Sequence, residues 1–140
     1  HFLEHWKEEW SYKFIHLSLV KKGRNDMPYI STKTTVTITA EKQEAIKKKL
    51  GKAIELIPGK SENWLMVSFD DNSSMYFKGS NENPLAFVEV KLFGKASQDG
   101  YKKLTRVITD ILHEELGIQS DCIYVKYEEV STWGFNGTNL

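Results

Sequence analysis

The stretch PLAFVEVKLFG, residues 84–94, is a long apolar segment with the composition of a β-strand. Successive side chains of a strand point to opposite faces, and we expect apolar residues on both faces here. They are Leu85 and Phe87 on one face and Ala86, Val88, Val90 and Leu92 on the other. Helices can cover one face, but a chain of 140 residues supplies little to cover the second. We therefore expect an oligomer in which the sheets of several chains cover one another.

A strand, a helix and a second strand precede this stretch. PYISTKTTVTI, residues 28–38, and NWLMVSF, residues 63–69, have the residue types of strands. Between them, residues 39–59 form a predicted helix that Thr39 caps and that Pro58 and Gly59 end. Its apolar stripe consists of Ile46, Leu50, Ala53, Ile54 and Ile57. After the second strand, a turn at residues 70–74 and a short return strand at residues 75–79 are expected.

The same order of elements follows the stretch. Residues 97–117 form a predicted helix, capped by Ser97 and ended by Gly117, and CIYVKYEEV, residues 122–130, is a predicted strand. The apolar stripe of this helix is Tyr101, Leu104, Ile108, Ile111 and Leu112. Two β-α-β units predict an α+β fold, with a four-stranded mixed sheet and both helices on one face. Residues 132–140 are a short tail with room for one final strand.

Bulk composition is that of one ordinary globular domain. The chain is 40% hydrophobic, and 19 basic residues balance 19 acidic ones, so nucleic acid is not an expected partner. The apolar runs are too short to cross a bilayer, so no membrane association is expected. A single cysteine, Cys122, excludes an internal disulfide and cysteine-clustered zinc.

Met27 and Pro28 divide the chain. We expect residues 1–27 to be a leader or an upstream extension outside the fold, and residues 28–140 to form the domain. Methionine aminopeptidases remove an initiator methionine that precedes proline, which would leave Pro28 with a free secondary amine. In an apolar pocket the pKa of this amine falls below the usual α-amino range of about 7.7 to 8.0, so it becomes a general base. The alternative is that Pro28 simply begins a strand, where proline is tolerated.

From Pro28 onward the sequence resembles the macrophage migration inhibitory factor family of the tautomerase superfamily. The resemblance lies in the order and spacing of MPYI, PGK, PLAFVEVKLFGK, YKKLTRVITDILHEELGI, CIYVKY and WGFNG. It implies a barrel-like homotrimer with active sites between subunits. It also implies keto–enol tautomerase activity of the phenylpyruvate or dopachrome type on small aromatic α-keto acids. No metal or cofactor is needed. The family's Cys-Ala-Leu-Cys motif corresponds to LAFV at residues 85–88, so thiol–disulfide activity is not expected.

The resemblance assigns roles to particular residues. Pro28 matches the catalytic base, and Lys60 matches the lysine that pairs with the substrate carboxylate. Phe93 stands where the family has an aliphatic pocket residue, and Tyr124 matches a tyrosine donated by the neighbouring subunit. The remaining pocket residues implied are Lys126, Trp133 and Phe135. Animal members have asparagine at the position of Lys126, which either adds a second positive charge or changes the preferred substrate.

Three functions are compatible with this resemblance. The first is a tautomerase that is inactive or weak while residues 1–27 remain attached. The second is a cytokine-like secreted protein that binds a host receptor, with the pocket incidental. The third is a trimeric domain that has lost catalysis. Without a signal peptide, we expect a cytoplasmic location, or secretion by a route that uses none.

Overall fold

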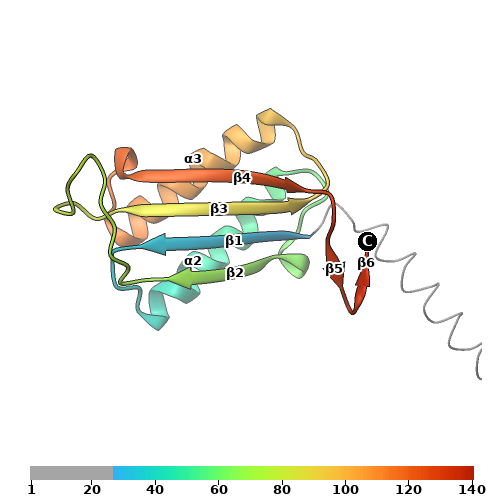
Figure 1. Cartoon of the computed structure of the whole chain (residues 1–140), viewed down its shortest axis with the longest axis horizontal. Helices are drawn as coiled ribbons and strands as arrows, with labels where there is room; N and C mark the ends of the chain where they lie inside the picture. The colour runs from blue at the N-terminus through green and yellow to red at the C-terminus, as the bar shows by residue number, and fades with distance from the viewer. Residues whose placement is uncertain (1–26) are drawn as a thin grey trace, which may run out of the picture.

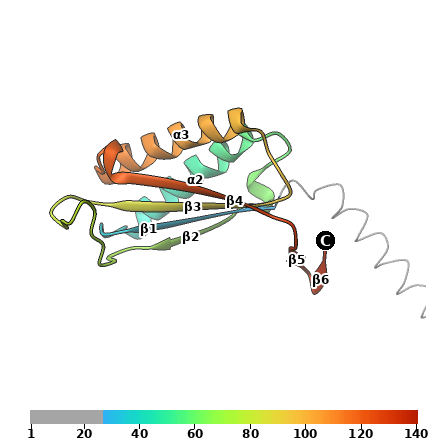
Figure 2. The same ribbon diagram turned by 45° about the horizontal axis from the view of Figure 1, so that its top comes forward.

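The computed structural model describes residues 27–140, which form a four-stranded sheet with two helices on one face (Figure 1, Figure 2). The strands are β1 (Pro28–Thr34), β2 (Met66–Asp70), β3 (Ala86–Phe93) and β4 (Ile123–Val130). The helices are α2 (Ala40–Ala53) and α3 (Gln98–Leu116). Short 3-10 turns are η1 (Ile54–Leu56), η2 (Glu62–Trp64) and η3 (Ser120–Cys122), and a terminal hairpin pairs β5 (Gly134–Phe135) with β6 (Thr138–Asn139).

The sheet has the strand order β2-β1-β3-β4. β1 is parallel to β2 and β3 is parallel to β4, whereas β1 and β3 are antiparallel. Helix α2 connects the first parallel pair and α3 the second, because parallel neighbours need a long crossover. The predicted fold class, two β-α-β units in one mixed sheet, is confirmed.

Both helices begin and end at the predicted signals. The Thr39 hydroxyl accepts a hydrogen bond from the Lys42 amide, and the Ser97 hydroxyl accepts one from the Gly100 amide. Gly117 closes α3 in the left-handed conformation, with φ of 68°. All residues of the two predicted apolar stripes are buried in one core against the sheet. No helix in residues 27–140 has the length and apolarity needed to span a membrane.

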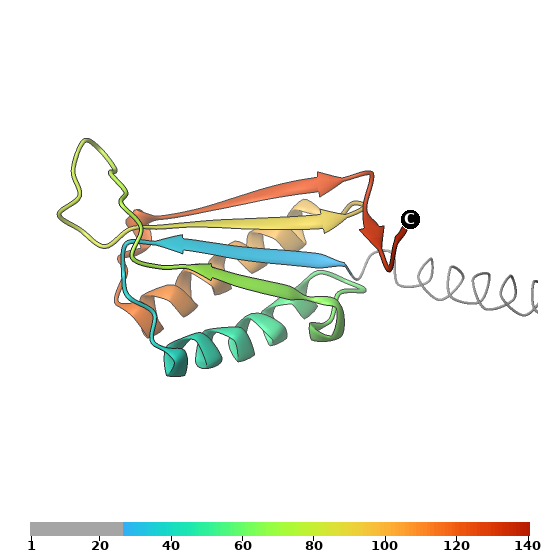
Figure 3. The same ribbon diagram turned by 60° about the horizontal axis from the view of Figure 1, so that its bottom comes forward.

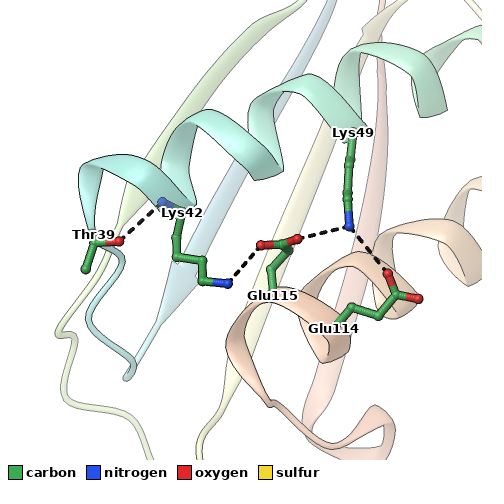
Figure 4. Close-up of polar contacts among 5 residues, drawn as sticks. All are labelled: Thr39, Lys42, Lys49, Glu114 and Glu115. Carbon is green, nitrogen blue, oxygen red and sulfur yellow. Dashed lines mark hydrogen bonds and ion pairs between the residues drawn. The ribbon is translucent and has the colours of Figure 1, made fainter.

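An ion-pair network joins the two helices on the side away from the sheet (Figure 4). Glu115 Oε2 lies 3.2 Å from Lys42 Nζ, and Glu115 Oε1 lies 3.0 Å from Lys49 Nζ. Lys49 also lies 3.4 Å from Glu114. The hydrogen bonds from Lys49 and Lys42 lower the pKa of the Glu115 carboxyl. The network therefore links α2, at Lys42 and Lys49, to the end of α3.

The sheet face opposite the helices differs from the sequence prediction. The strand was expected to be apolar on both faces, but alternation also puts Glu89 and Lys91 on the open face beside Phe87. The same face carries a hydrogen bond of 2.6 Å between the Tyr29 and Ser68 hydroxyls. The middle of the open face is therefore polar, and only its ends are apolar.

Three predicted boundaries are also corrected. The first strand ends at Thr34 rather than residue 38, and the second begins at Met66, because Asn63 and Trp64 belong to η2. Residues 75–79 form no return strand; they contribute only a bridge between Phe77 and Ser80. Lys78 and Gly79 both have positive φ, of 53° and 75°, which turns the chain before a strand can extend.

Candidate functional site

Pro28 lies at the end of the sheet where β1 begins and β3 and β4 end (Figure 1). It pairs with Leu92 in β3, and the Phe93 amide donates a 3.3 Å hydrogen bond to the Met27 carbonyl. The β5–β6 hairpin lies at the same end of the sheet (Figure 3). This end therefore gathers Pro28, the last residue of β3 and the C-terminal tail.

A second, smaller apolar core forms here, separate from the core under the helices. It consists of Met27, Phe93, Trp133, Phe135 and Leu140, and we name it the tail cluster. Met27 and Phe93 are 3% and 7% exposed. The Phe93 and Trp133 rings meet edge to face at 6.5 Å, and the Leu140 amide donates to the Trp133 carbonyl at 2.9 Å. The tail is thereby held against the end of β3.

A cavity of about 490 Å³ opens beside Pro28, and we name it the proline cavity. Its lining residues are Met27, Pro28, Tyr29, Asn63, Trp64, Leu65, Met66, Trp133, Gly134 and Phe135. Trp64 and Phe135 form an edge-to-face pair with ring centres 5.3 Å apart. Most of these side chains are apolar, so the cavity suits an apolar or aromatic group.

Three of the residues predicted for the site, Pro28, Trp133 and Phe135, line this cavity together. Lys60 and Phe93 are buried and do not line it. Lys60 is 5% exposed and follows Gly59, whose φ of 82° turns the chain after α2 and η1. Its amide donates to the Ile57 carbonyl at 3.1 Å.

Tyr124 lies toward the other end of the sheet. It pairs with Phe87 in β3, five positions along the strand from the Leu92 that pairs with Pro28. At the usual rise of about 3.3 Å per residue, this separates the two by roughly 17 Å. The Tyr124 ring packs edge to face against Phe77 and Phe87 and remains 56% exposed. Within one chain, Tyr124 does not reach the proline cavity.

Lys126 lies two residues further along β4, on the open face of the sheet. Its ammonium is 2.6 Å from Glu128 Oε1 and 3.9 Å from Glu89 Oε1. The hydrogen bond to Glu128, and its charge, raise the pKa of Lys126, with a smaller contribution from Glu89. The positive charge of Lys126 is therefore already matched by carboxylates of its own sheet.

The loop that follows Phe93 is anchored by Glu129. Its Oε2 accepts hydrogen bonds from the Ala96 amide at 3.1 Å and the Tyr101 hydroxyl at 2.7 Å. These bonds lower the pKa of the Glu129 carboxyl, chiefly through Tyr101, while burial and Glu129 raise the pKa of Tyr101. The loop from β3 to α3 is thereby fixed to the end of β4, next to the tail cluster.

Sequence reasoning missed several residues of this site. Trp64 was expected inside a strand, but η2 directs it to the proline cavity. Leu140 and Met27 belong to the tail cluster, although neither was expected to contribute to the site. For Leu140, the sequence offered one signal of a role in the site: it is an apolar residue in a tail that was expected to line the pocket rim.

Comparison with known proteins relates the described part of the chain to one family. The family model described as macrophage migration inhibitory factor (MIF) matches residues 27–140. The chain is similar to the crystal structure of Leishmania major MIF2, with 30% identity and a TM-score of 0.77, covering 82% of this chain and 98% of that one. A comparison with curated proteins found no match.

Two further structures are similar. The macrophage migration inhibitory factor homologue from Prochlorococcus marinus has 28% identity and a TM-score of 0.68, covering 79% of this chain and 97% of that one. The factor from Toxoplasma gondii has 21% identity and a TM-score of 0.70, covering 80% and 99%, a likeness of fold alone.

Proposed function

The chain belongs to the macrophage migration inhibitory factor family, and we propose that it is a keto–enol tautomerase with Pro28 as its general base. The observation that carries the proposal is Pro28 on the wall of an apolar cavity, together with Trp133 and Phe135. A base that removes a proton next to a carbonyl needs a site that excludes water and holds an apolar substrate.

The chemistry requires Pro28 to be the first residue. Only then is its nitrogen a secondary amine with a basic lone pair. The apolar walls disfavour the ammonium form, which lowers the pKa of the amine toward neutrality. The neutral nitrogen removes a proton from the carbon next to the ketone, and the resulting ammonium donates that proton to the enolate oxygen, which completes the conversion of ketone to enol.

We propose a small aromatic α-keto acid, of the phenylpyruvate type, as substrate. Its ring lies against Trp133 and Phe135. The family resemblance makes Lys60 the partner of its carboxylate, although Lys60 is buried and does not line the cavity within one chain. Tyr124 of a neighbouring copy donates a hydrogen bond to the substrate, because Tyr124 of the same chain is too far from Pro28. Amino-acid side chains and the N-terminal amine are sufficient to carry out proton transfer of this kind.

This proposal predicts a homotrimer in solution. Pro28 and Tyr124 lie toward opposite ends of one sheet, so a complete site needs the Tyr124 end of one copy beside the Pro28 end of the next. Multi-angle light scattering at micromolar concentration should give three times the 16.2 kDa mass of one chain. A monomer under these conditions would contradict a site shared between copies.

Lys126 should matter little for substrate binding, because Glu128 and Glu89 already hold its ammonium. In a chain that begins at Pro28, we expect Lys126→Asn to change the KM for phenylpyruvate by less than about twofold, since paired surface charges contribute little. Light scattering should show the same oligomer. A KM raised by about tenfold, with the oligomer intact, would instead make Lys126 a substrate anchor.

The proposed function is tested by phenylpyruvate enolisation with a chain that begins at Pro28. Turnover that a Pro28→Gly substitution strongly reduces would support the assignment. A folded trimer without turnover would instead favour the receptor-binding role or a domain that has lost catalysis.

A further inference from the structure

The terminal hairpin turns at an asparagine–glycine pair. β5 and β6 pair Phe135 with Thr138, so Asn136 and Gly137 form the two-residue turn between the strands. Their φ angles are 52° and 78°, as a type I′ turn requires, and asparagine followed by glycine is a pair that this turn favours. Both residues are exposed. Among the asparagines of the whole sequence, Asn136 alone precedes a glycine.

We propose that Asn136 deamidates spontaneously, and that its isoaspartate product frees Leu140 from the tail cluster. The backbone nitrogen of Gly137 loses its proton and bonds to the side-chain carbonyl carbon of Asn136, and the side-chain nitrogen leaves as ammonia. The product is a five-membered succinimide ring. Water then opens the ring at either carbonyl, which gives aspartate, or isoaspartate, in which the backbone runs through the side-chain methylene and carbonyl. Water is the only reagent that the reaction consumes.

The surroundings of Gly137 leave room for this attack. A Cβ atom placed on Gly137 would meet no other atom within 4 Å, and glycine itself has no Cβ to obstruct the Asn136 side chain. The planar ring does not fit a type I′ turn, so the hairpin must open before the ring forms. Each strand of this hairpin has only two residues and lies at the end of the chain, so the hairpin opens more readily than the main sheet.

Asn72 provides a comparison within the same chain. It is also exposed and has a φ of 54°, but its side-chain oxygen accepts a 2.6 Å hydrogen bond from the Thr37 hydroxyl. The amide of the following residue, Ser73, donates a 2.9 Å hydrogen bond to the Thr34 carbonyl. Both the attacking nitrogen and the carbonyl group that it would attack are therefore held in place at Asn72.

The two products have different effects on the hairpin. Aspartate keeps the backbone unchanged, and aspartate followed by glycine also suits a type I′ turn. Isoaspartate adds a methylene group to the backbone, so the turn no longer matches the pairing of Phe135 with Thr138. The Leu140 amide then loses its position beside the Trp133 carbonyl, to which it donates at 2.9 Å. Because Phe135 lines the proline cavity, the change reaches the wall of that cavity.

The first test follows the full 140-residue chain during incubation at physiological temperature in mildly alkaline buffer, because base favours loss of the Gly137 amide proton. Peptide mapping by liquid chromatography and mass spectrometry, after digestion at acidic pH, measures conversion at each asparagine and separates aspartate from isoaspartate. Asn136 should convert at least about tenfold faster than Asn72, since the glycine that follows Asn136 has no Cβ. Conversion of Asn136 no faster than that of Asn72 would overturn the proposal.

The second test follows the release of Leu140, with Asn136→Gly as the matched control. Two glycines also suit a type I′ turn, so this variant keeps the hairpin but has no side-chain amide to lose. Hydrogen exchange of the C-terminal peptide should become faster during incubation of the unchanged chain, in step with isoaspartate formation, and should stay constant in Asn136→Gly. Equal acceleration in both chains, or none in the unchanged chain, would overturn the release of Leu140.

Asn136→Asp, measured before incubation, separates the two products. It has the aspartate side chain on an unchanged backbone, so its hydrogen exchange should match that of the unchanged chain. Exchange as fast as in the incubated chain would show that the new charge, rather than the added methylene, releases the tail, and would overturn the role of isoaspartate. Neither readout involves turnover, so these results do not depend on the proposed function.

Discussion

A chain that begins at Pro28 is expected to enolise phenylpyruvate about 10²- to 10⁴-fold faster than the 140-residue chain, the contribution typical of a general base. In the longer chain the Pro28 nitrogen is a tertiary amide, which has no basic lone pair near neutral pH. In addition, Met27 is buried in the tail cluster beside the cavity. Removing residues 1–27 changes both features, so the effect should be large.

The two forms should be assayed side by side, after mass spectrometry has verified the first residue of each. Light scattering should give the same number of subunits for both, since β1 begins at Pro28. Equal activity of an uncut long chain and the short chain would show that Pro28 is not the base. Unfolding of the short chain would instead contradict a domain boundary at Met27.

The second large effect is expected for Lys60→Ala in the chain that begins at Pro28. Loss of a charge-assisted contact with the substrate carboxylate should remove about 1.5 to 3 kcal/mol of binding, which corresponds to a 10- to 150-fold rise in KM for phenylpyruvate. The value of kcat should change much less, because the carboxylate carries its charge both in the bound substrate and in the transition state.

Because Lys60 is buried, its truncation also removes packing, and Lys60→Met separates the two effects. Methionine retains most of the apolar stem but has no ammonium, so its KM should rise as far as that of the alanine variant. Lys52→Ala, at an exposed position near the end of α2, is the control for a general loss of positive charge. A KM within about twofold of the unchanged enzyme for Lys60→Met would assign the carboxylate to another group.

Local sequence determined the helices and the connectivity of this protein. The stripes of α2 and α3, the caps at Thr39 and Ser97, and the stop at Gly117 all depend on residues a few positions apart. Each pair of strands is connected by a segment long enough for a helix, and such a connection favours parallel pairing of the two strands. For this reason the four-stranded sheet with two helices on one face was predictable from the chain alone.

Only the tertiary structure decided which residues meet at the end of the sheet. Met27, Trp64 and Leu140 are far apart in sequence, and no periodic pattern relates them. Their positions depend on the register of β1 against β3, on the η2 turn and on the terminal hairpin. Each of these is set by contacts between distant segments, which local propensities do not specify.

The open face of the sheet illustrates the same limit. The run of apolar residues at 84–94 predicted two apolar faces, but strict alternation puts Glu89 and Lys91 on one of them, near Lys126 and Glu128 of β4. The sequence determined which side chains of β3 share a face. The pairing of β3 with β4 decided that the charges of Lys126, Glu89 and Glu128 lie together, because side chains on adjacent strands meet only when the register is set.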